Sequence, residues 1–374
     1  MIVNAGYRGK VGAGAPKFTY TGQYNVRKDG VVELLTSGTI VFLEPKVIDV
    51  FMVGGGGGGA GLQSGDTSQH GYGGGGGGYT RTIRRLNIAA NTSIPVTVGS
   101  GGASSQNGGS TAFNAISVLG GDSPKGNLTK RKNGGAGGSG GGGGVDSNSD
   151  YGAGGSDGTA GENGYPTTAL GGTGQGFTTR EFGESAGKLY GGGGGGGRYM
   201  AASSPVVSMG GAGGGGAGGW YGAKADLYQA AAAGVANTGG GGGGGAFWDS
   251  VNNNTPGASG GSGIVCFRES QELPELAGTW VLNERLYAPE NSVDFTGQNF
   301  KIGNATDPNA NTAKTLICST TTIKYTTIAG FTSTLYTFSR HEWGSEKYKY
   351  LTFSTGATAS DEFRTWLASN ATKQ

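Results

Sequence analysis

The chain has 374 residues, of which 85 are glycine and 10 are proline, and its formal net charge is only +2. This glycine and proline content is typical of disordered low-complexity chains. The 14 Phe, 16 Tyr and 5 Trp residues argue against disorder, because disordered chains contain few aromatic residues. The small net charge also excludes strong self-repulsion, so we expect a folded protein.

The N-terminal sequence MIVNAGYRGKVG, within a predicted arm of residues 1–17, lacks the apolar core of a secretory signal. No window approaches the roughly 18 consecutive apolar residues of a membrane-spanning helix, so we expect no membrane insertion.

Residues 18–53 have the pattern of a small antiparallel β-sheet. The segment FTYTGQY alternates aromatic and polar residues, and the apolar runs after it are separated by Asp-Gly, Ser-Gly and Glu-Pro turn signals. The strand GIVCFR, which contains Cys266, is expected to pair back onto this sheet. We therefore predict one domain over residues 18–268.

Glycine runs interrupt this domain, and the main ones lie at residues 54–59, 73–78, 134–144, 191–197, 210–219 and 239–245. A phosphate-binding loop needs Gly-Lys followed by Ser or Thr, and collagen needs a strict Gly-X-Y period with abundant proline; neither pattern is present. Flexible linkers usually mix serine with glycine, whereas these runs abut aromatic residues. We therefore predict a bundle of polyglycine II helices, which are extended rods whose backbone groups can hydrogen-bond to neighbouring rods.

Two segments have helical patterns. The Ala-rich residues 223–234 end at a glycine, and residues 360–371 place Phe363, Trp366 and Leu367 on one face behind a Ser360 cap. Beyond residue 273 glycine is infrequent, and strongly alternating Thr, Tyr and Phe segments favour strands. The predicted fold is therefore mainly β. It has antiparallel sheets and a bundle of polyglycine II helices, followed over residues 273–374 by a β-rich C-terminal domain with a terminal α-helix.

Catalytic, metal and cofactor sites are not predicted. The histidines, His70 and His341, and the cysteines, Cys266 and Cys318, lack the spacing of a zinc site, and we expect both cysteines to be buried free thiols. The carboxylates Asp146, Asp150 and Asp157 lie in a Ser/Gly/Asn-rich segment and are expected to be solvated. The basic clusters Arg81/Arg84/Arg85 and Lys125/Lys130/Arg131/Lys132 are also expected on solvated surfaces, with attraction to anionic glycans as the alternative and nucleic acid not expected.

Aromatic residues beside the glycine runs are the best binding candidates, because Tyr and Trp give a large contact area at low entropic cost. The alternative is that the rings cap the core of the bundle. The candidates are Trp220, Tyr221, Phe247, Trp248, Tyr72 and Tyr79.

The order of elements suggests a family. The segment from YTGQYNV to FMVGGGGGG is followed by GGGGGGYTRTI, PVTVGSGG, STAFNAISVLGG and GGSGIVCFR. This order resembles the glycine-rich domain proteins of bacteriophage tails and tail fibres, and the glycine content is similar to that of phage adhesins with a polyglycine II tip. The resemblance implies a protein of the virion tail, assembled in the host cytoplasm, that binds a bacterial surface receptor, either a glycan or an outer surface protein. It also implies contacts with other tail or baseplate proteins, and a homo-trimer. The alternative is a structural virion component without receptor contact.

Overall fold

The computed structural model contains two compact units, Met1–Ser270 and Gln271–Gln374, which are described separately. The described residues are 17–63, 70–125, 132–144, 160–162, 179–184, 186–199, 208–221, 228–247, 254–270, 275, 277–282, 300–303, 311–318, 322–327, 332–337, 350–353, 364, 368 and 371–373. The predicted N-terminal arm lies outside them, apart from Lys17. Within these residues the protein is mainly β and has no α-helix, and no helix is long and apolar enough to cross a membrane.

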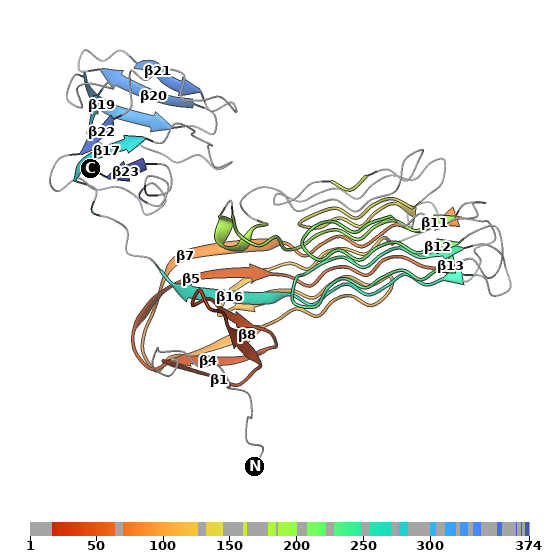
Figure 1. Ribbon diagram of the computed structural model, residues 1–374. Coiled ribbons are helices and arrows are strands. Elements are labelled where there is room, and N and C mark those ends of the chain that lie inside the picture. The colour runs from red at the N-terminus through yellow and green to blue at the C-terminus, as the bar shows by residue number, and fades with distance from the viewer. Residues whose placement is uncertain are drawn as a thin grey trace. The chain divides into compact units, whose positions relative to one another are not determined.

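Two five-stranded antiparallel sheets form the base of the first unit (Figure 1). The first has the order β1-β4-β8-β9-β10, with strands Phe18–Tyr20, Gly38–Phe42, Ser93–Thr97, Thr111–Phe113 and Ile116–Val118. The second has the order β2-β3-β16-β5-β7, with strands Tyr24–Val26, Val32–Leu34, Ile264–Glu269, Lys46–Val53 and Thr80–Ile88. The predicted return of residues 264–269 onto the opening sheet is confirmed, because β16 lies between β3 and β5.

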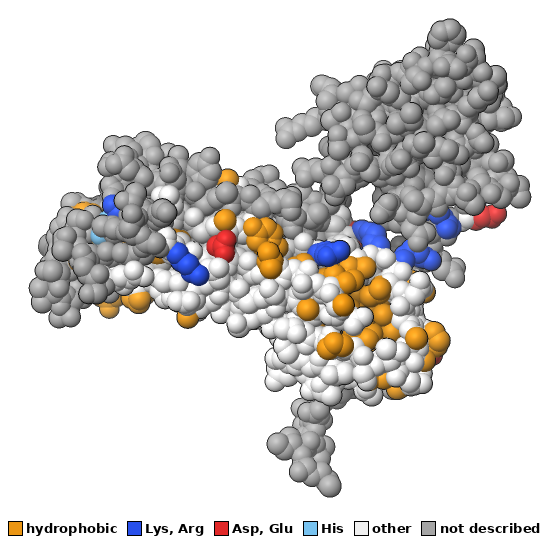
Figure 2. All heavy atoms as spheres, turned by 180° about the vertical axis from the view of Figure 1, so that it is seen from behind, with side chains coloured by type: hydrophobic (Ala, Val, Ile, Leu, Met, Phe, Trp, Pro, Cys, Tyr) orange, Lys and Arg blue, Asp and Glu red, His pale blue; other side chains and the backbone are white. Residues whose placement is uncertain are grey.

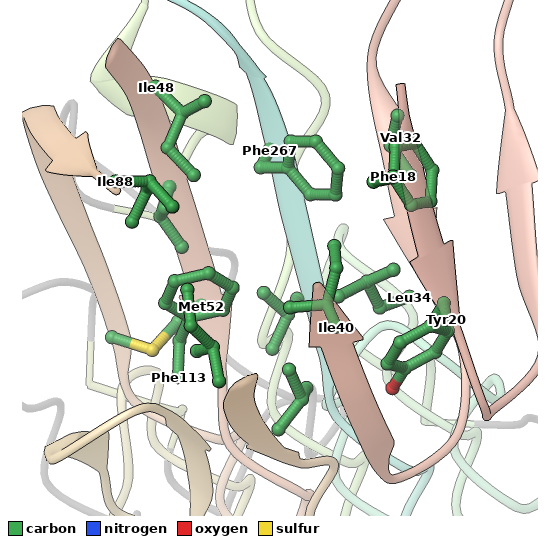
Figure 3. Packing of buried hydrophobic residues seen from close by; sticks show 14 of the residues in the cluster. Phe18, Tyr20, Val32, Leu34, Ile40, Ile48, Met52, Ile88, Phe113 and Phe267 are labelled. Carbon is green, nitrogen blue, oxygen red and sulfur yellow. The ribbon is translucent and has the colours of Figure 1, made fainter. Parts of the chain in front are cut away.

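Apolar side chains from both sheets form one shared core (Figure 3). Successive residues of a strand point to opposite faces, and β5 is buried on both. Ile48, Val50 and Met52 belong to the shared core, whereas Phe51 and Val53 belong to a second cluster with Phe182 and Tyr190. The second sheet is therefore covered on its other face by residues 179–190, which include the short 3-10 helix η1 (Glu181–Gly183).

The glycine runs continue directly from strands of the second sheet (Figure 1). Strand β5 ends at Val53 and the first run begins at Gly54; the second run ends at Gly78, just before β7. These two runs lie antiparallel, because the N–H groups of Gly54, Gly57 and Ala60 donate to the carbonyl groups of Tyr79, Gly76 and Gly73 at 2.8–2.9 Å. The chain thus runs outward from the sheet and returns to it beside its own outward path.

Hydrogen bonds from residues 54–60 repeat every third residue, unlike those of a β-strand, which repeat every second residue. The donor and acceptor pairs are Gly54–Tyr79, Gly57–Gly76 and Ala60–Gly73 for one neighbour, Gly55–Gly109 and Gly58–Gln106 for another, and Gly56–Gly261 and Gly59–Ala258 for a third. Carbonyl groups of the same run accept from three further segments, through the N–H groups of Gly102 and Ser105, of Gly121, and of Gly242 and Gly245. The run therefore has six hydrogen-bonded neighbours, whereas a strand inside a sheet has two.

Close approach between these segments requires glycine. A Cβ added at Gly56 would lie 2.0 Å from the carbonyl oxygen of Gly240, and one added at Gly76 would lie 2.0 Å from that of Ala136. Both contacts are with backbone, which cannot move aside as the end of a side chain can. The interior of the bundle consequently consists of backbone held by backbone hydrogen bonds, which satisfies the polar groups that burial would otherwise leave without partners.

Two three-stranded ladders lie at the end of the rods away from the two sheets (Figure 1). One has the order β15-β14-β6, with strands Asn254–Thr255, Ala246–Phe247 and His70–Gly71. The other has the order β11-β12-β13, with strands Arg198–Tyr199, Trp220–Tyr221 and Tyr228–Gln229; its β11–β12 pair is parallel.

The predicted helix over residues 223–234 is wrong where the structure describes it. Tyr228 and Gln229 form β13, and the Ala232 N–H donates across to the Ala217 carbonyl rather than along its own segment. Alanine has the highest helix propensity of any residue, but propensity is a weak prior that tertiary contacts override. Here the backbone groups of the Ala-rich segment form hydrogen bonds with the bundle.

The second unit contains one seven-stranded antiparallel sheet with the order β21-β20-β19-β18-β22-β17-β23. In that order its strands are Thr332–Thr337, Thr322–Thr327, Asn311–Cys318, Phe300–Gly303, Tyr350–Phe353, Gly278–Leu282 and Ala371–Lys373. The helix predicted over residues 360–371 falls almost wholly outside the described residues, and its last residue, Ala371, begins β23.

Candidate functional site

The two ladders at the far end of the bundle form the candidate site. Strand β11 contacts β6 and β14, and β12 contacts β14 and β15, so the ladders meet at one place. Four connecting segments of the sequence begin and end there, namely residues 64–69, 200–207, 222–227 and 248–253. This end of the bundle therefore brings together sequence segments that are far apart in the chain.

Most of the aromatic candidates are buried at this end. Tyr72, Trp220, Tyr221 and Phe247 are at most 3% exposed. Their rings are buried in this conformation, as expected of the alternative in which they cap the bundle, and their part in binding stays a prediction. Trp248 lies outside the described residues.

Tyr79 is separated from the other candidates. It is half-buried, immediately precedes β7, and its N–H donates to the Leu119 carbonyl at 3.1 Å. This position is at the end of the rods next to the two sheets. The structure therefore brings together Tyr72, Trp220, Tyr221 and Phe247, but not Tyr79.

His70 is part of the same aromatic cap. The β6–β14 register places His70 opposite Phe247, and the His70 ring meets the Tyr72 ring edge-on with 4.7 Å between centroids. The His70 side chain is 1% exposed, and Tyr72, Phe247 and Ala60 form one apolar cluster beside it. Edge-on aromatic pairs of this kind add about 0.5–1.5 kcal/mol beyond the area that they bury.

A charged cluster lies at the other end of this unit, on the outer face of the second sheet. The Arg27 guanidinium donates to both carboxylate oxygens of Glu181 at 2.7 and 2.8 Å, and the Tyr190 hydroxyl donates to Glu181 at 3.2 Å. Hydrogen bonds to Asp29 and Glu181 raise the pKa of Arg27. Bidentate pairs of this geometry are among the stronger polar interactions in proteins, and this pair connects η1 to the residue that follows strand β2.

A second set of contacts holds the same segment to β16. The Arg268 guanidinium lies 4.2 Å from the centroid of the Phe182 ring and forms ion pairs with Glu184 and Asp49. These contacts, together with the Arg27–Glu181 pair, dock residues 179–190 onto the sheet. Sequence reasoning missed this cluster, because the partners are far apart in sequence and residues 179–190 match no strand or helix pattern.

Burial makes the thiol and the phenol of this cluster poor nucleophiles. Cys266 is a free cysteine with no exposed surface, and burial raises the pKa of its thiol. Burial likewise raises the pKa of the Tyr190 hydroxyl, which lies 3.9 Å from the Cys266 sulfur. Since the thiolate is the reactive form of cysteine, Cys266 acts as a small apolar core residue.

Other candidate groups are dispersed or fall outside the description. Among the described residues no three His, Cys, Asp or Glu side chains are grouped so as to hold a metal ion. His341, Lys130, Arg131 and the three carboxylates at positions 146, 150 and 157 lie outside those residues. Of the basic residues on β7, Arg81 is exposed, whereas Arg84 donates to the Phe182 carbonyl within the charged cluster. On the face of the bundle seen in Figure 2, few charged side chains appear among the described residues.

The sheets, the continuing glycine rods and the capped far end define a glycine-rich β protein. The sequence profile of the glycine-rich domain family matches residues 36–269, from just before β4 to the end of β16. Because the match covers more than half of the chain, the protein belongs to this family. No curated protein matches the chain in a sequence comparison.

Proposed function

We propose that this protein is a bacteriophage tail or tail-fibre adhesin that binds the surface of a bacterial cell. The segments at the far end of the glycine bundle make the contact, and the protein is carried on the virion tail with other tail or baseplate proteins, as a homo-trimer. The single observation that carries the proposal is that the described residues flanking four connecting segments meet at one end of a hydrogen-bonded scaffold. Binding scaffolds in general hold variable loops on a rigid frame.

The rods of this scaffold are polyglycine II helices in our proposal. Three observations support this conformation: the three-residue repeat of the hydrogen bonds, the six neighbours of residues 54–60, and the contacts that a Cβ would make with backbone. Polyglycine II has three residues per turn and no internal hydrogen bonds, so its donors point outward in three directions in succession. A bundle of such rods is stiff because each one is held from all sides.

The proposed role is binding without catalysis, and it needs no cofactor, metal, nucleic acid or membrane insertion. The order of elements that resembles phage tail proteins supports the placement on a virion. The scarcity of charged side chains among the described residues on the face of the bundle seen in Figure 2 favours a neutral, polar target over a strongly charged one. Net charge is also close to neutral, at +2, so long-range attraction to an anionic surface is weak.

The test uses the fluorescently labelled full chain on a panel of bacterial isolates. In one variant, residues 222–227 and 248–253 are replaced by Gly-Ser sequences of equal length; in the control variant, Leu43→Ser changes a side chain that is 54% exposed beside β4. We expect the wild type and Leu43→Ser to bind one or more isolates, and the segment-replaced variant to lose binding with its melting temperature retained. Equal binding by all three proteins would show that residues 222–227 and 248–253 do not make the contact with the cell.

A structural virion component without receptor contact is the second candidate. The burial of Tyr72, Trp220, Tyr221 and Phe247 favours it, since these rings act as caps of the bundle. This function predicts that the wild type binds no isolate of the panel. It also predicts that substitutions of the four rings lower the melting temperature.

A further inference from the structure

Three tyrosines face one another across the β11-β12-β13 ladder at the far end of the bundle. The register pairs Tyr199 with Tyr221, and Tyr221 with Tyr228. Residues directly opposite each other on neighbouring strands have Cβ atoms about 4.5–5.5 Å apart and lie on the same face. Tyr199, Tyr221 and Tyr228 therefore form one row of phenol rings, which we call the tyrosine row. The pairing register that aligns them is set by tertiary contacts, so sequence analysis had no signal for the row.

The outer end of the tyrosine row is open to solvent. Tyr221 is 3% exposed and Tyr228 is 60% exposed. Their rings are nearly parallel, with an interplanar angle of 15° and 6.1 Å between centroids. The buried ring thus fixes the orientation of the exposed one, and an aromatic side chain held in this way loses little entropy when a ligand binds.

The described residues that follow Tyr228 on its own segment are uncharged. Gln229, Ala230, Ala232 and Ala233 lie there and are exposed. Among the large apolar side chains that are exposed in the described part of the chain, Tyr228 is the only aromatic one. A protein-binding hot spot normally needs several large side chains in a packed cluster, whereas the described residues of this segment offer a single exposed ring.

We propose that Tyr228, oriented by Tyr221, is a stacking platform for a pyranose ring of a bacterial surface glycan. This inference rests on the proposed adhesin function and names its ligand class. The face of an aromatic ring is negative, and the C–H groups on one side of a pyranose present a flat, weakly positive surface that fits it. The Tyr228 hydroxyl both donates and accepts hydrogen bonds, as sugar hydroxyl groups require.

The experiment compares the labelled wild type with Tyr228→Ala, Tyr228→Phe and Val235→Ala. Val235 is the matched control, because it lies on the same segment and is 57% exposed. Binding is measured to the isolates that bind the wild type, before and after periodate oxidation of surface sugars or digestion of surface proteins with protease. It is also measured to an array of bacterial surface polysaccharides, and melting temperatures confirm that each variant is folded.

We expect Tyr228→Ala to weaken binding by about tenfold or more, within the range of aromatic hot spots. Tyr228→Phe keeps the ring and should bind within about threefold of the wild type, while Val235→Ala should bind as the wild type does. Periodate should abolish binding, whereas protease should not.

Binding that survives periodate but not protease identifies a protein receptor and overturns the glycan inference while leaving the adhesin function intact. Undiminished binding by a folded Tyr228→Ala would show that Tyr228 does not contact the receptor. That result would overturn the glycan inference and leave the adhesin function intact. If the wild type binds neither cells nor any polysaccharide of the array, the proposed function and this inference both fail.

Discussion

At Gly76 the bundle leaves no room for any side chain. A Cβ would lie 2.0 Å from the Ala136 carbonyl oxygen, and the Gly76 N–H donates to the Asp122 carbonyl, so its backbone cannot shift without breaking that bond. We predict that Gly76→Val lowers the free energy of unfolding by about 3 kcal/mol or more, at or beyond the upper end of ordinary overpacking. The measurement is chemical denaturation of the full chain.

The matched control for Gly76→Val is Ala233→Val, which places the same valine side chain at an exposed position of the bundle. Its free energy of unfolding should change by less than about 0.5 kcal/mol, as is usual at the surface. Equal stabilities of the two variants would mean that the glycine runs tolerate side chains, as a linker does.

The Cys266 thiol links stability to alkaline pH. Burial raises its pKa well above the ordinary value of 9.0, so on unfolding the thiol loses its proton at a lower pH than in the folded protein. The contribution of the thiol to stability is complete below pH 9.0 and is lost as the pH rises towards the folded-state pKa. We predict that Cys266→Ala shows a shallower decline of melting temperature than the wild type between about pH 9 and 10.5. Parallel curves for the two proteins would contradict this.

Residues 257–263 show how an outer element of the bundle is encoded. Their sequence, GASGGSG, has glycine at every third position, and Pro256 and Ser259 are exposed while Gly257 is buried. The Ala-rich segment repeats the pattern, because residues 231, 234 and 237 are less exposed than those between them. Glycine at every third position is present in the sequence of residues 257–263. The Ala-rich segment has glycine only at residue 234 among its three less exposed positions, so no glycine period marked it, and its high alanine propensity for helices led to the helix prediction over residues 223–234.

The docked segment 179–190 depends on the Arg27–Glu181 pair. Glu181 is 4% exposed, and a buried carboxylate that loses its partner is strongly destabilising. We predict that Arg27→Met lowers the free energy of unfolding by about 3 kcal/mol and that the double variant Arg27→Met/Glu181→Met recovers part of that loss. A double variant no more stable than the single one would contradict this account.

A surface pair serves as the control for Arg27→Met. The Lys17 and Glu44 side chains are 64% and 36% exposed and form an ion pair at 2.9 Å. Lys17→Met should change the free energy of unfolding by less than about 1 kcal/mol, because exposed pairs contribute little. Both changes remove one cation, so the difference between them isolates the effect of burial.

We expect the two compact units, Met1–Ser270 and Gln271–Gln374, to fold independently. The seven-stranded sheet of the second unit is formed entirely within Gln271–Gln374, and a domain with its own sheet can fold alone. We predict that a fragment of residues 271–374 gives a dispersed NMR spectrum, and that residues 1–270 unfold at the same temperature as the first unit of the full chain. A collapsed spectrum of the fragment would contradict the first expectation.

The sequence predicted the β segments and the hydrogen-bonding of the glycine runs to one another, because alternation and glycine content are local signals. It could not predict which rods become neighbours, since Gly56 meets residue 261 and Gly75 meets residue 242 only after the whole bundle has assembled. For the same reason, the inward orientation of Tyr72 and Phe247 and the docking of Glu181 onto Arg27 were not predictable. Burial and pairing of such residues are decided by tertiary contacts, which local patterns do not contain.

The backbone-only interior has a consequence at the level of the gene. Every glycine codon begins with two guanines, and any base change that is not silent either replaces glycine with a residue that has a Cβ or stops translation. In the interior runs nearly all such changes place an atom against a carbonyl group. We expect missense variation in a population of this gene to be almost absent from the inward-facing glycine codons and to accumulate between codons 64–69, 200–207, 222–227 and 248–253. A scaffold of this kind would let the connecting segments diversify quickly while the glycine codons of the bundle stay fixed.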